Sequence, residues 1–120
     1  VLQGTRVVVT TCASATFHGA WDEKHGRPVK FATVIVDEAA QASEPDVVLP
    51  ALLAEQRVVV VGDHKQLGPV VTEHNLCRAY LVALEKPMLE RLYETPDILP
   101  ASTMLDMQYR MHPSIRSFPS

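Results

Sequence analysis

The sequence has few cysteines, no long apolar run and no excess of basic residues, and each absence excludes a class of protein. Its two cysteines, Cys12 and Cys77, lie far apart in the chain and fit reduced thiols better than a disulfide framework. No apolar run approaches the ~20 residues that a membrane helix needs, and no signal peptide is visible. We therefore expect an intracellular protein, cytoplasmic or nuclear, without a membrane anchor.

The charge balance also limits the possible partners. The formal net charge is −3, so the chain lacks a general basic surface, and any contact with nucleic acid must be local or come from other segments.

The pair His74-x-x-Cys77 has no second pair at zinc spacing, which argues against a zinc site. The chain begins at Val1 and stops just after a helix-start signal, so we expect an excerpt of a larger protein.

Three short β-branched runs, at residues 6–11, 33–37 and 57–61, predict three strands of an α/β fold. Each run is continuously apolar rather than alternating, which is typical of strands covered on both faces of a parallel sheet. The connections between the runs are long enough for crossovers. A further short strand is predicted at 104–108.

Helix signals lie between and after these runs. Ser43 and Asp46 flank Pro45 in a helix-start pattern, and Pro50 predicts a kink or two short turns. The buried stripe of this helix is expected at Val47, Val48, Ala51 and Leu52. Other helices are predicted at 87–94 and from His112-Pro113-Ser114 onward, with a polar loop at 18–30 and a proline-containing linker at 95–102.

Acidic side chains follow the second run, in the string V-I-V-D-E-A-A-Q that ends at Gln41. An Asp at a strand end suits magnesium held through water, so Asp37 is the candidate metal ligand. Glu38 could orient and deprotonate an attacking water, and Gln41 follows it three residues later. The alternative is two solvated carboxylates at the end of a strand.

The third run ends in V-G-D-H-K-Q-L-G-P, in which Gly62 permits a sharp exit from the strand. Asp63 and Gln66 then fall in a loop beside the first acidic pair. The neutral amide of Gln66 can donate to a γ-phosphate oxygen without changing protonation. The alternative is an ordinary polar loop with its turn at Gly68-Pro69.

Two further segments carry candidate site residues. Arg110, in the string Q-Y-R-M-H-P, follows the linker, and its guanidinium could stabilise charge on a transferring phosphoryl group across a cleft. Alternatively, it pairs with a surface carboxylate. Thr11 and Ser14, in T-T-C-A-S, could contact the phosphates of nucleic acid or cap a helix, and the sequence favours neither reading.

Taken together, T-T-C-A-S-A, V-D-E-A-A-Q, G-D-H-K-Q-L-G-P and Q-Y-R-M-H-P resemble the superfamily 1 helicases. The similarity is to the branch of the nonsense-mediated-decay RNA helicase and its zinc-finger-bearing relatives. It implies two RecA-like P-loop NTPase lobes, ATP and Mg²⁺ between them, and a single strand of RNA or DNA across their top. Residues 1–95 would be the later part of the first lobe, 96–102 a linker and 103–120 the start of the second lobe.

The resemblance implies roles for the same residues. Asp37 would serve magnesium, Glu38 would activate water, and Gln41, Gln66 and Arg110 would contact or approach the nucleotide, while Thr11 to Ser14 would face nucleic acid. The chain departs from the family because it has no G-x-x-x-x-G-K followed by Ser or Thr. We therefore expect the isolated chain to bind ATP weakly and to be inactive alone. The alternative function is a non-catalytic protein- or RNA-binding module derived from a helicase lobe.

Overall fold

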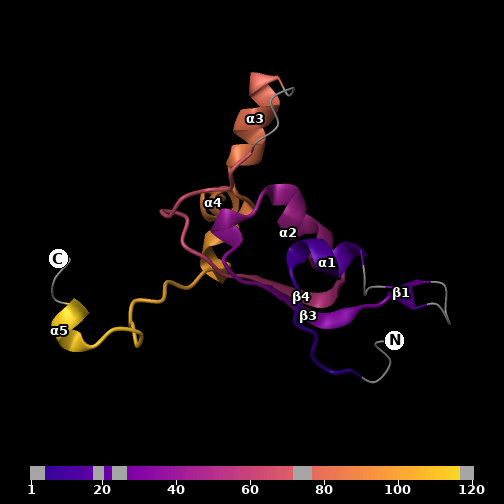
Figure 1. Cartoon of the computed structure of the whole chain (residues 1–120), viewed down its shortest axis with the longest axis horizontal. Coiled ribbons are helices and arrows are strands. Elements are labelled where there is room, and N and C mark those ends of the chain that lie inside the picture. The colour runs from indigo at the N-terminus through magenta and orange to yellow at the C-terminus, as the bar shows by residue number, and fades with distance from the viewer. Residues whose placement is uncertain (1–4, 18–20, 23–26, 72–76, 117–120) are drawn as a thin grey trace.

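The computed structural model describes residues 5–17, 21–22, 27–71 and 77–116. At its centre, strand β3 (Phe31–Val36) pairs in parallel with strand β4 (Ala54–Val60), with Val36 opposite Val60 and an irregularity in register near Thr33. Helix α2 (Glu44–Ala51) forms the crossover between the two strands and packs against helix α1 (Cys12–Phe17). Figure 1 shows α1, α2 and α4 (Met88–Tyr93) on the same side of the strand pair.

The remaining elements are short or peripheral. Strands β1 (Trp21–Asp22) and β2 (Arg27–Pro28) form a small antiparallel ladder. Helix α3 (Arg78–Glu85) buries no residue and projects from the rest of the molecule (Figure 1). Two 3₁₀ turns, η1 (Ala39–Gln41) and η2 (Leu99–Ala101), follow β3 and α4, and helix α5 (Pro113–Arg116) comes last.

The core of the described residues lies between the strand pair and the helices. Val36, Ala39 and Val47 are buried in one cluster, and Cys12 and Met88 pack against it from α1 and α4. Val34 and Val60 complete this side of the strands. Ile35 points the other way and is 67% exposed, because successive side chains of a strand face opposite sides. The expectation of cover on both faces is therefore wrong for the described residues.

The α/β class and the parallel pairing are confirmed, and so are the second and third predicted strands. The first and fourth are wrong, because 6–11 and 104–108 are extended but belong to no strand. Val9 is 93% exposed and Leu105 is 83% exposed. A strand needs a hydrogen-bonded neighbour. Strands β3 and β4 pair with each other and not with residues 6–11 or 104–108.

Helix α2 begins where the sequence predicted and continues past Pro50 as one helix that ends at Ala51. Ser43 stands at its N-cap, but its hydroxyl donates to the Asp46 carboxylate rather than accepting from the helix backbone. Val47 is fully buried as expected, whereas Leu52 is 61% exposed and Pro50 is buried in its place. The helices predicted at 87–94 and from His112 are confirmed as α4 and α5.

Two segments differ from the prediction in detail. Helix α3 was not predicted, and the predicted loop at 18–30 contains β1 and β2, although 18–20 and 23–26 lie outside the described residues. His74 of the His-x-x-Cys pair also lies outside them. Residues 95–102, which the sequence predicts to be a linker, form consecutive hydrogen-bonded turns that include η2, and their role as a linker stays a prediction.

Candidate active site at the strand ends

The carboxyl ends of β3 and β4 are joined by backbone hydrogen bonds that continue beyond the strands. Val61 N–H donates to the Val36 carbonyl at 2.8 Å, and Ala39 N–H donates to the Val61 carbonyl at 2.9 Å. These bonds hold the two polar loops side by side, as expected for neighbouring parallel strands. A Cβ on Gly62 would lie 3.1 Å from the backbone nitrogen of Ala40, so glycine at this position lets the two loops approach without a shift of the neighbouring backbone.

Glu38 stands in an unusual backbone conformation directly after Asp37. Its φ of 52° and ψ of 35° are left-handed, a region that costs a non-glycine residue on the order of 1–3 kcal/mol. Local hydrogen bonds hold this turn. Asp37 Oδ1 accepts the Glu38 N–H at 2.9 Å, and Gln41 donates its backbone N–H to the Glu38 carbonyl and its side-chain amide to Glu38 Oε2. The Glu38 carboxylate is thereby fixed at the strand end and remains exposed.

The loop after β4 is organised by Asp63. Its Oδ1 accepts the Lys65 backbone N–H at 2.9 Å, and its Oδ2 accepts the Gln66 side-chain amide at 3.3 Å. The first of these hydrogen bonds, followed by the second, lowers the pKa of Asp63 below its ordinary value, because both stabilise the carboxylate. The loop is therefore shaped by its own aspartate, and Gln66 is held within it.

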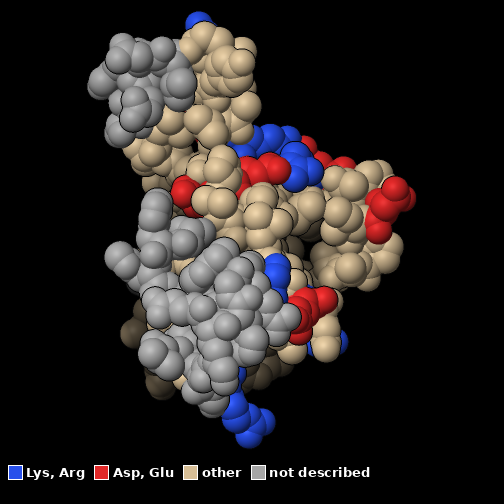
Figure 2. Space-filling model, turned by 90° about the vertical axis from the view of Figure 1, so that its right-hand side faces the viewer, with Lys and Arg blue, Asp and Glu red and all other residues tan. Residues whose placement is uncertain are grey.

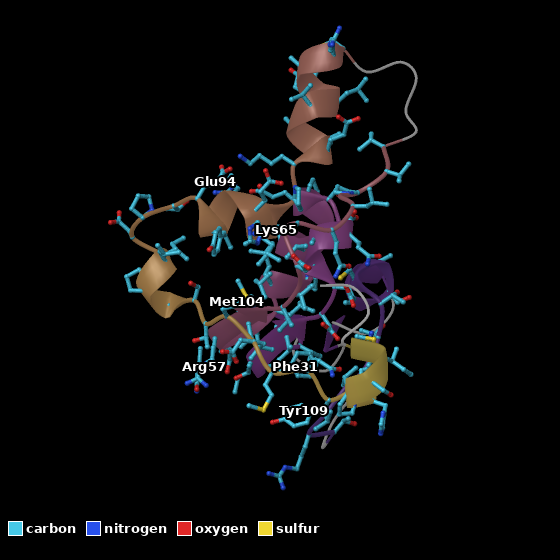
Figure 3. All side chains as sticks on the ribbon, turned by 90° about the vertical axis from the view of Figure 1, so that its left-hand side faces the viewer. Phe31, Arg57, Lys65, Glu94, Met104 and Tyr109 are labelled. Atoms are coloured by element: carbon cyan, nitrogen blue, oxygen red, sulfur yellow. The ribbon has the colours of Figure 1, made fainter. Side chains whose placement is uncertain are left out.

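Gln41 and Gln66 come from different loops but line the same open pocket. The pocket has a volume of about 790 Å³, and its other lining residues are Lys65, Leu67, Gly68 and Val70. Sequence reasoning did not single out Lys65, which is labelled in Figure 3. The sequence contained a signal for it, because Lys65 is the only lysine or arginine between Asp63 and Gln66. Asp37 and Glu38 lie at the adjacent strand end rather than in the pocket wall.

Thr11 caps helix α1. Its hydroxyl oxygen accepts the Ser14 N–H at 3.2 Å, and its carbonyl accepts the Ala15 N–H at 2.9 Å. Cys12, which follows it, packs on the core beside Val36 and Ala39, so the start of α1 lies near the same strand end. The capping alternative is therefore observed, and a contact of Thr11 and Ser14 with nucleic acid stays a prediction.

The segment between η2 and α5, which includes Arg110, extends away from the strand pair (Figure 1). Gln108 holds the turn around Arg110 by accepting the Met111 N–H at 2.8 Å and donating to the Met111 carbonyl at 3.0 Å. Arg110 itself is exposed. Within the described ranges it forms no ion pair, so the surface pairing considered for it is not observed there.

The donor set at the β3 end suits a magnesium ion held largely through water. Asp37 is exposed, and its Oδ2 has no partner among the described residues. An exposed carboxylate oxygen is the kind of ligand that Mg²⁺ uses, and it needs few of them. In the described part of the chain, no three His, Cys, Asp or Glu side chains converge as metal ligands.

Comparison with known proteins shows the family to which this sequence belongs. Residues 1–74 match the AAA domain family. The chain belongs to this family. Over its whole length it is 41% identical to the ATP-dependent helicase upf1 of Schizosaccharomyces pombe and 38% identical to the regulator of nonsense transcripts 1 homolog of Drosophila melanogaster. It spans 12% and 9% of those relatives.

A third relative is the human 3'-5' exoribonuclease HELZ2, 42% identical over 89 residues, which are 72% of this chain and 3% of that protein. These matches confirm the resemblance to superfamily 1 helicases and the RecA-like α/β class.

The surface charge of the described residues is mixed. Figure 2 shows acidic and basic side chains next to one another on the described part of one face. None of the helices in the described ranges has the length and apolarity needed to cross a membrane.

Proposed function

We propose that this chain is the part of an ATP-dependent nucleic-acid helicase or translocase that contributes the water-activating and phosphate-sensing loops. In this proposal residues 1–95 belong to the first RecA-like lobe, 96–102 connect the lobes and 103–120 begin the second lobe. The chain lacks the phosphate loop, so ATP binding and turnover are assigned to the complete protein.

The observation that carries the proposal is the pairing of the two strand ends. Backbone hydrogen bonds join the loops of Glu38 and Gln66, and amides from both loops line one pocket. The left-handed backbone of Glu38 supports a functional role as well, because such strain persists only where surrounding contacts hold it, and it gathers at active sites.

In the proposed mechanism, Glu38 accepts a proton from the attacking water and orients it toward the γ-phosphate. Asp37 would hold a magnesium ion, which would supply neutralisation of the charge on the phosphate oxygens. Gln41 and Gln66 donate hydrogen bonds from the pocket wall, so that Gln66 responds to the presence of the γ-phosphate. Arg110 approaches the same phosphate from the second lobe when the lobes close, and its planar guanidinium stabilises the transferring group.

The nucleic acid in this proposal is single-stranded RNA, bound in part by Thr11 and Ser14. Support for RNA comes from the relatives, several of which are named regulators of nonsense transcripts. The fragment's charge of −3 assigns most phosphate contacts to other segments of the complete protein. The compartment proposed is the cytoplasm or the nucleus.

The test is Glu38→Gln in the complete protein. This change keeps the size and hydrogen bonding of the side chain but removes the base, so ATP turnover should fall by about 10²–10⁴-fold while ATP binding persists. Steady-state hydrolysis and binding of a fluorescent ATP analogue would be measured together.

The matched control is Glu55→Gln, which removes an exposed carboxylate of β4 and should leave turnover unchanged. Parental hydrolysis by a folded Glu38→Gln protein would overturn the assignment of the base. A complete protein that binds RNA but hydrolyses no ATP would support the non-catalytic binding module instead.

A further inference from the structure

The open pocket at the strand ends contains a charged side chain to which the proposed function gives no role. Among the described residues that line it, Lys65 is the only lysine or arginine, and none is a carboxylate. The other polar side chains of the wall are the amides of Gln41 and Gln66, and the remaining side chains are apolar. A pocket with a positive charge, amide donors and no carboxylate in its described wall suits an anion.

The acidic residues of the two loops bind groups other than the Lys65 ammonium. Asp63 accepts the Lys65 backbone N–H at 2.9 Å and the Gln66 side-chain amide at 3.3 Å, and Glu38 accepts the Gln41 side-chain amide at 3.3 Å. In the described part of the chain, the ammonium of Lys65 forms no ion pair. The backbone N–H of Lys65 is the largest cause of the lowered pKa of Asp63, and the charge of Lys65 is the smallest. That charge is therefore available to a ligand.

The two amides hold their carboxylates through long hydrogen bonds and keep a donor for a ligand. Both distances of 3.3 Å exceed the range of about 2.7–3.2 Å that is usual for N–H···O hydrogen bonds. A side-chain amide nitrogen carries two N–H groups, and each of these hydrogen bonds uses one of them. Gln41 and Gln66 can therefore donate to an oxyanion while Lys65 offsets its charge.

The backbone is anchored on both sides of Lys65. On one side, the ring of His64 stacks on the ring of Tyr93 in α4, with centroids 4.3 Å apart and planes inclined by 23°. On the other side, a Cβ on Gly68 would lie 3.1 Å from the carbonyl of Glu85, at the end of α3. These contacts fix the point at which the Lys65 side chain leaves the loop. A group whose backbone is already held loses less freedom when a ligand binds.

We propose that Lys65 binds the terminal phosphate of ATP in this pocket, with Gln41 and Gln66 as the accompanying donors. The inference rests on the proposed function, which places the γ-phosphate beside the same two amides. A terminal phosphate carries about 1.5–2 negative charges at neutral pH, whereas a phosphate of the nucleic-acid backbone carries about one, so the charge of Lys65 favours the terminal phosphate. ADP lacks the γ-phosphate, and Lys65 thereby contributes to the preference for ATP over ADP.

The experiment measures three affinities of the complete protein: for a fluorescent, non-hydrolysable ATP analogue, for fluorescent ADP, and for poly(U) without nucleotide. Lys65→Ala should weaken binding of the ATP analogue about three- to tenfold, because Lys65 is exposed and an exposed charged contact is worth a modest amount. The affinities for ADP and poly(U) should stay parental. The loss should shrink as the salt concentration is raised, since salt screens the contact.

Two further variants separate charge from shape. Lys65→Arg keeps the positive charge and should bind the ATP analogue about as well as the parent. Lys65→Gln removes the charge but keeps a long polar side chain, and should resemble Lys65→Ala. Circular dichroism reports folding, and Lys65→Gln carries the test if Lys65→Ala fails to fold.

Arg57→Ala is the matched control, because it removes an equal charge from an exposed position of β4 that is not part of the pocket wall. Figure 3 labels Arg57 well away from Lys65. The control should leave all three affinities unchanged.

Parental affinity for the ATP analogue in folded Lys65→Ala would overturn the inference. Equal losses for the ATP analogue and ADP would overturn it too, because they would show that Lys65 does not act on the terminal phosphate of ATP. A loss confined to poly(U) would assign the pocket to a phosphate of the nucleic-acid backbone instead. Failure of the proposed function is distinguishable, since Glu38→Gln would then hydrolyse ATP at the parental rate whatever the effect of Lys65→Ala on binding.

Discussion

The loops around Glu38 and the segment around Arg110 contribute to the same proposed site, but their side chains are held in different ways. Glu38 and Gln66 lie on loops joined by backbone hydrogen bonds, and Gly62 is pressed against the backbone of the neighbouring loop. Arg110 lies on an extended segment whose nearby apolar residues, such as Leu105, are mostly exposed. Among the described residues, the side chain of Gln108 organises the turn that carries Arg110.

Under the proposed function, this difference indicates how a two-lobe site would divide its work. The proposed water-activating and phosphate-sensing groups are arranged by contacts between two neighbouring loops, so their geometry would exist before the lobes close. The arginine is presented on a local turn and would depend on lobe movement to reach the phosphate. Substitutions at three positions, Arg110, Gly62 and Glu44, would sharpen or break this comparison.

The largest effect is expected at Arg110. In the complete protein, Arg110→Ala should lower nucleic-acid-stimulated ATP turnover by about 10³–10⁵-fold, as for other arginines supplied across a cleft. Arg110→Lys keeps the charge but loses the planar fork, and should rescue poorly. Binding of RNA without nucleotide should change little. Steady-state hydrolysis with circular dichroism as the folding control would check this, and near-parental turnover in folded Arg110→Ala would show that Arg110 is only a surface residue.

A smaller effect is expected at Gly62, on the preformed side of the comparison. Gly62→Ala would place a Cβ 2.9 Å from Leu89 and 3.1 Å from the Ala40 nitrogen, so the free energy of unfolding should fall by about 1–3 kcal/mol. Removing the Leu89 side chain relieves only the first contact. Gly62→Ala/Leu89→Ala should therefore recover part of the loss caused by Gly62→Ala, relative to Leu89→Ala alone. Thermal unfolding would measure all three variants, and a neutral Gly62→Ala would show that the two loops are not tightly apposed.

The smallest effect is expected at the ion pair between Glu44 and Arg91, which ties α2 to α4. The hydrogen bond from Arg91 lowers the pKa of Glu44 below its ordinary value of 4.5, so the pair stabilises the fold above that pH. The contribution is lost as the pH falls through the lowered folded pKa. Because the pair is partly exposed, Glu44→Gln should cost less than about 1 kcal/mol at neutral pH.

That cost should disappear in acid, well below pH 4.5, where Glu44 is protonated in both states. Thermal unfolding midpoints of parent and Glu44→Gln across this range would show the two curves converging. Glu55→Gln, which removes an exposed carboxylate without an ion pair among the described residues, is the control. A pH-independent difference between parent and Glu44→Gln would contradict the assignment.

The sequence by itself determined the local elements and the positions of the site residues on them. Apolar runs that end in polar residues located β3 and β4, and the cap at Ser43 and the prolines at 45 and 113 located the starts of α2 and α5. These signals are local, since strand and helix propensities and capping depend on neighbours in sequence. The strings around Glu38 and Gln66 likewise indicated adjacent strand ends, as the structure shows.

Only the tertiary structure decided which apolar runs became strands, because pairing depends on whether a partner strand is present. Residues 6–11 have a strand-like composition yet lie unpaired, with Val9 exposed. The contact of Gly62 with the neighbouring loop and the stack of His64 on Tyr93 also required the fold. Each depends on groups from separate segments meeting in space, and the order of residues along the chain does not specify such distances.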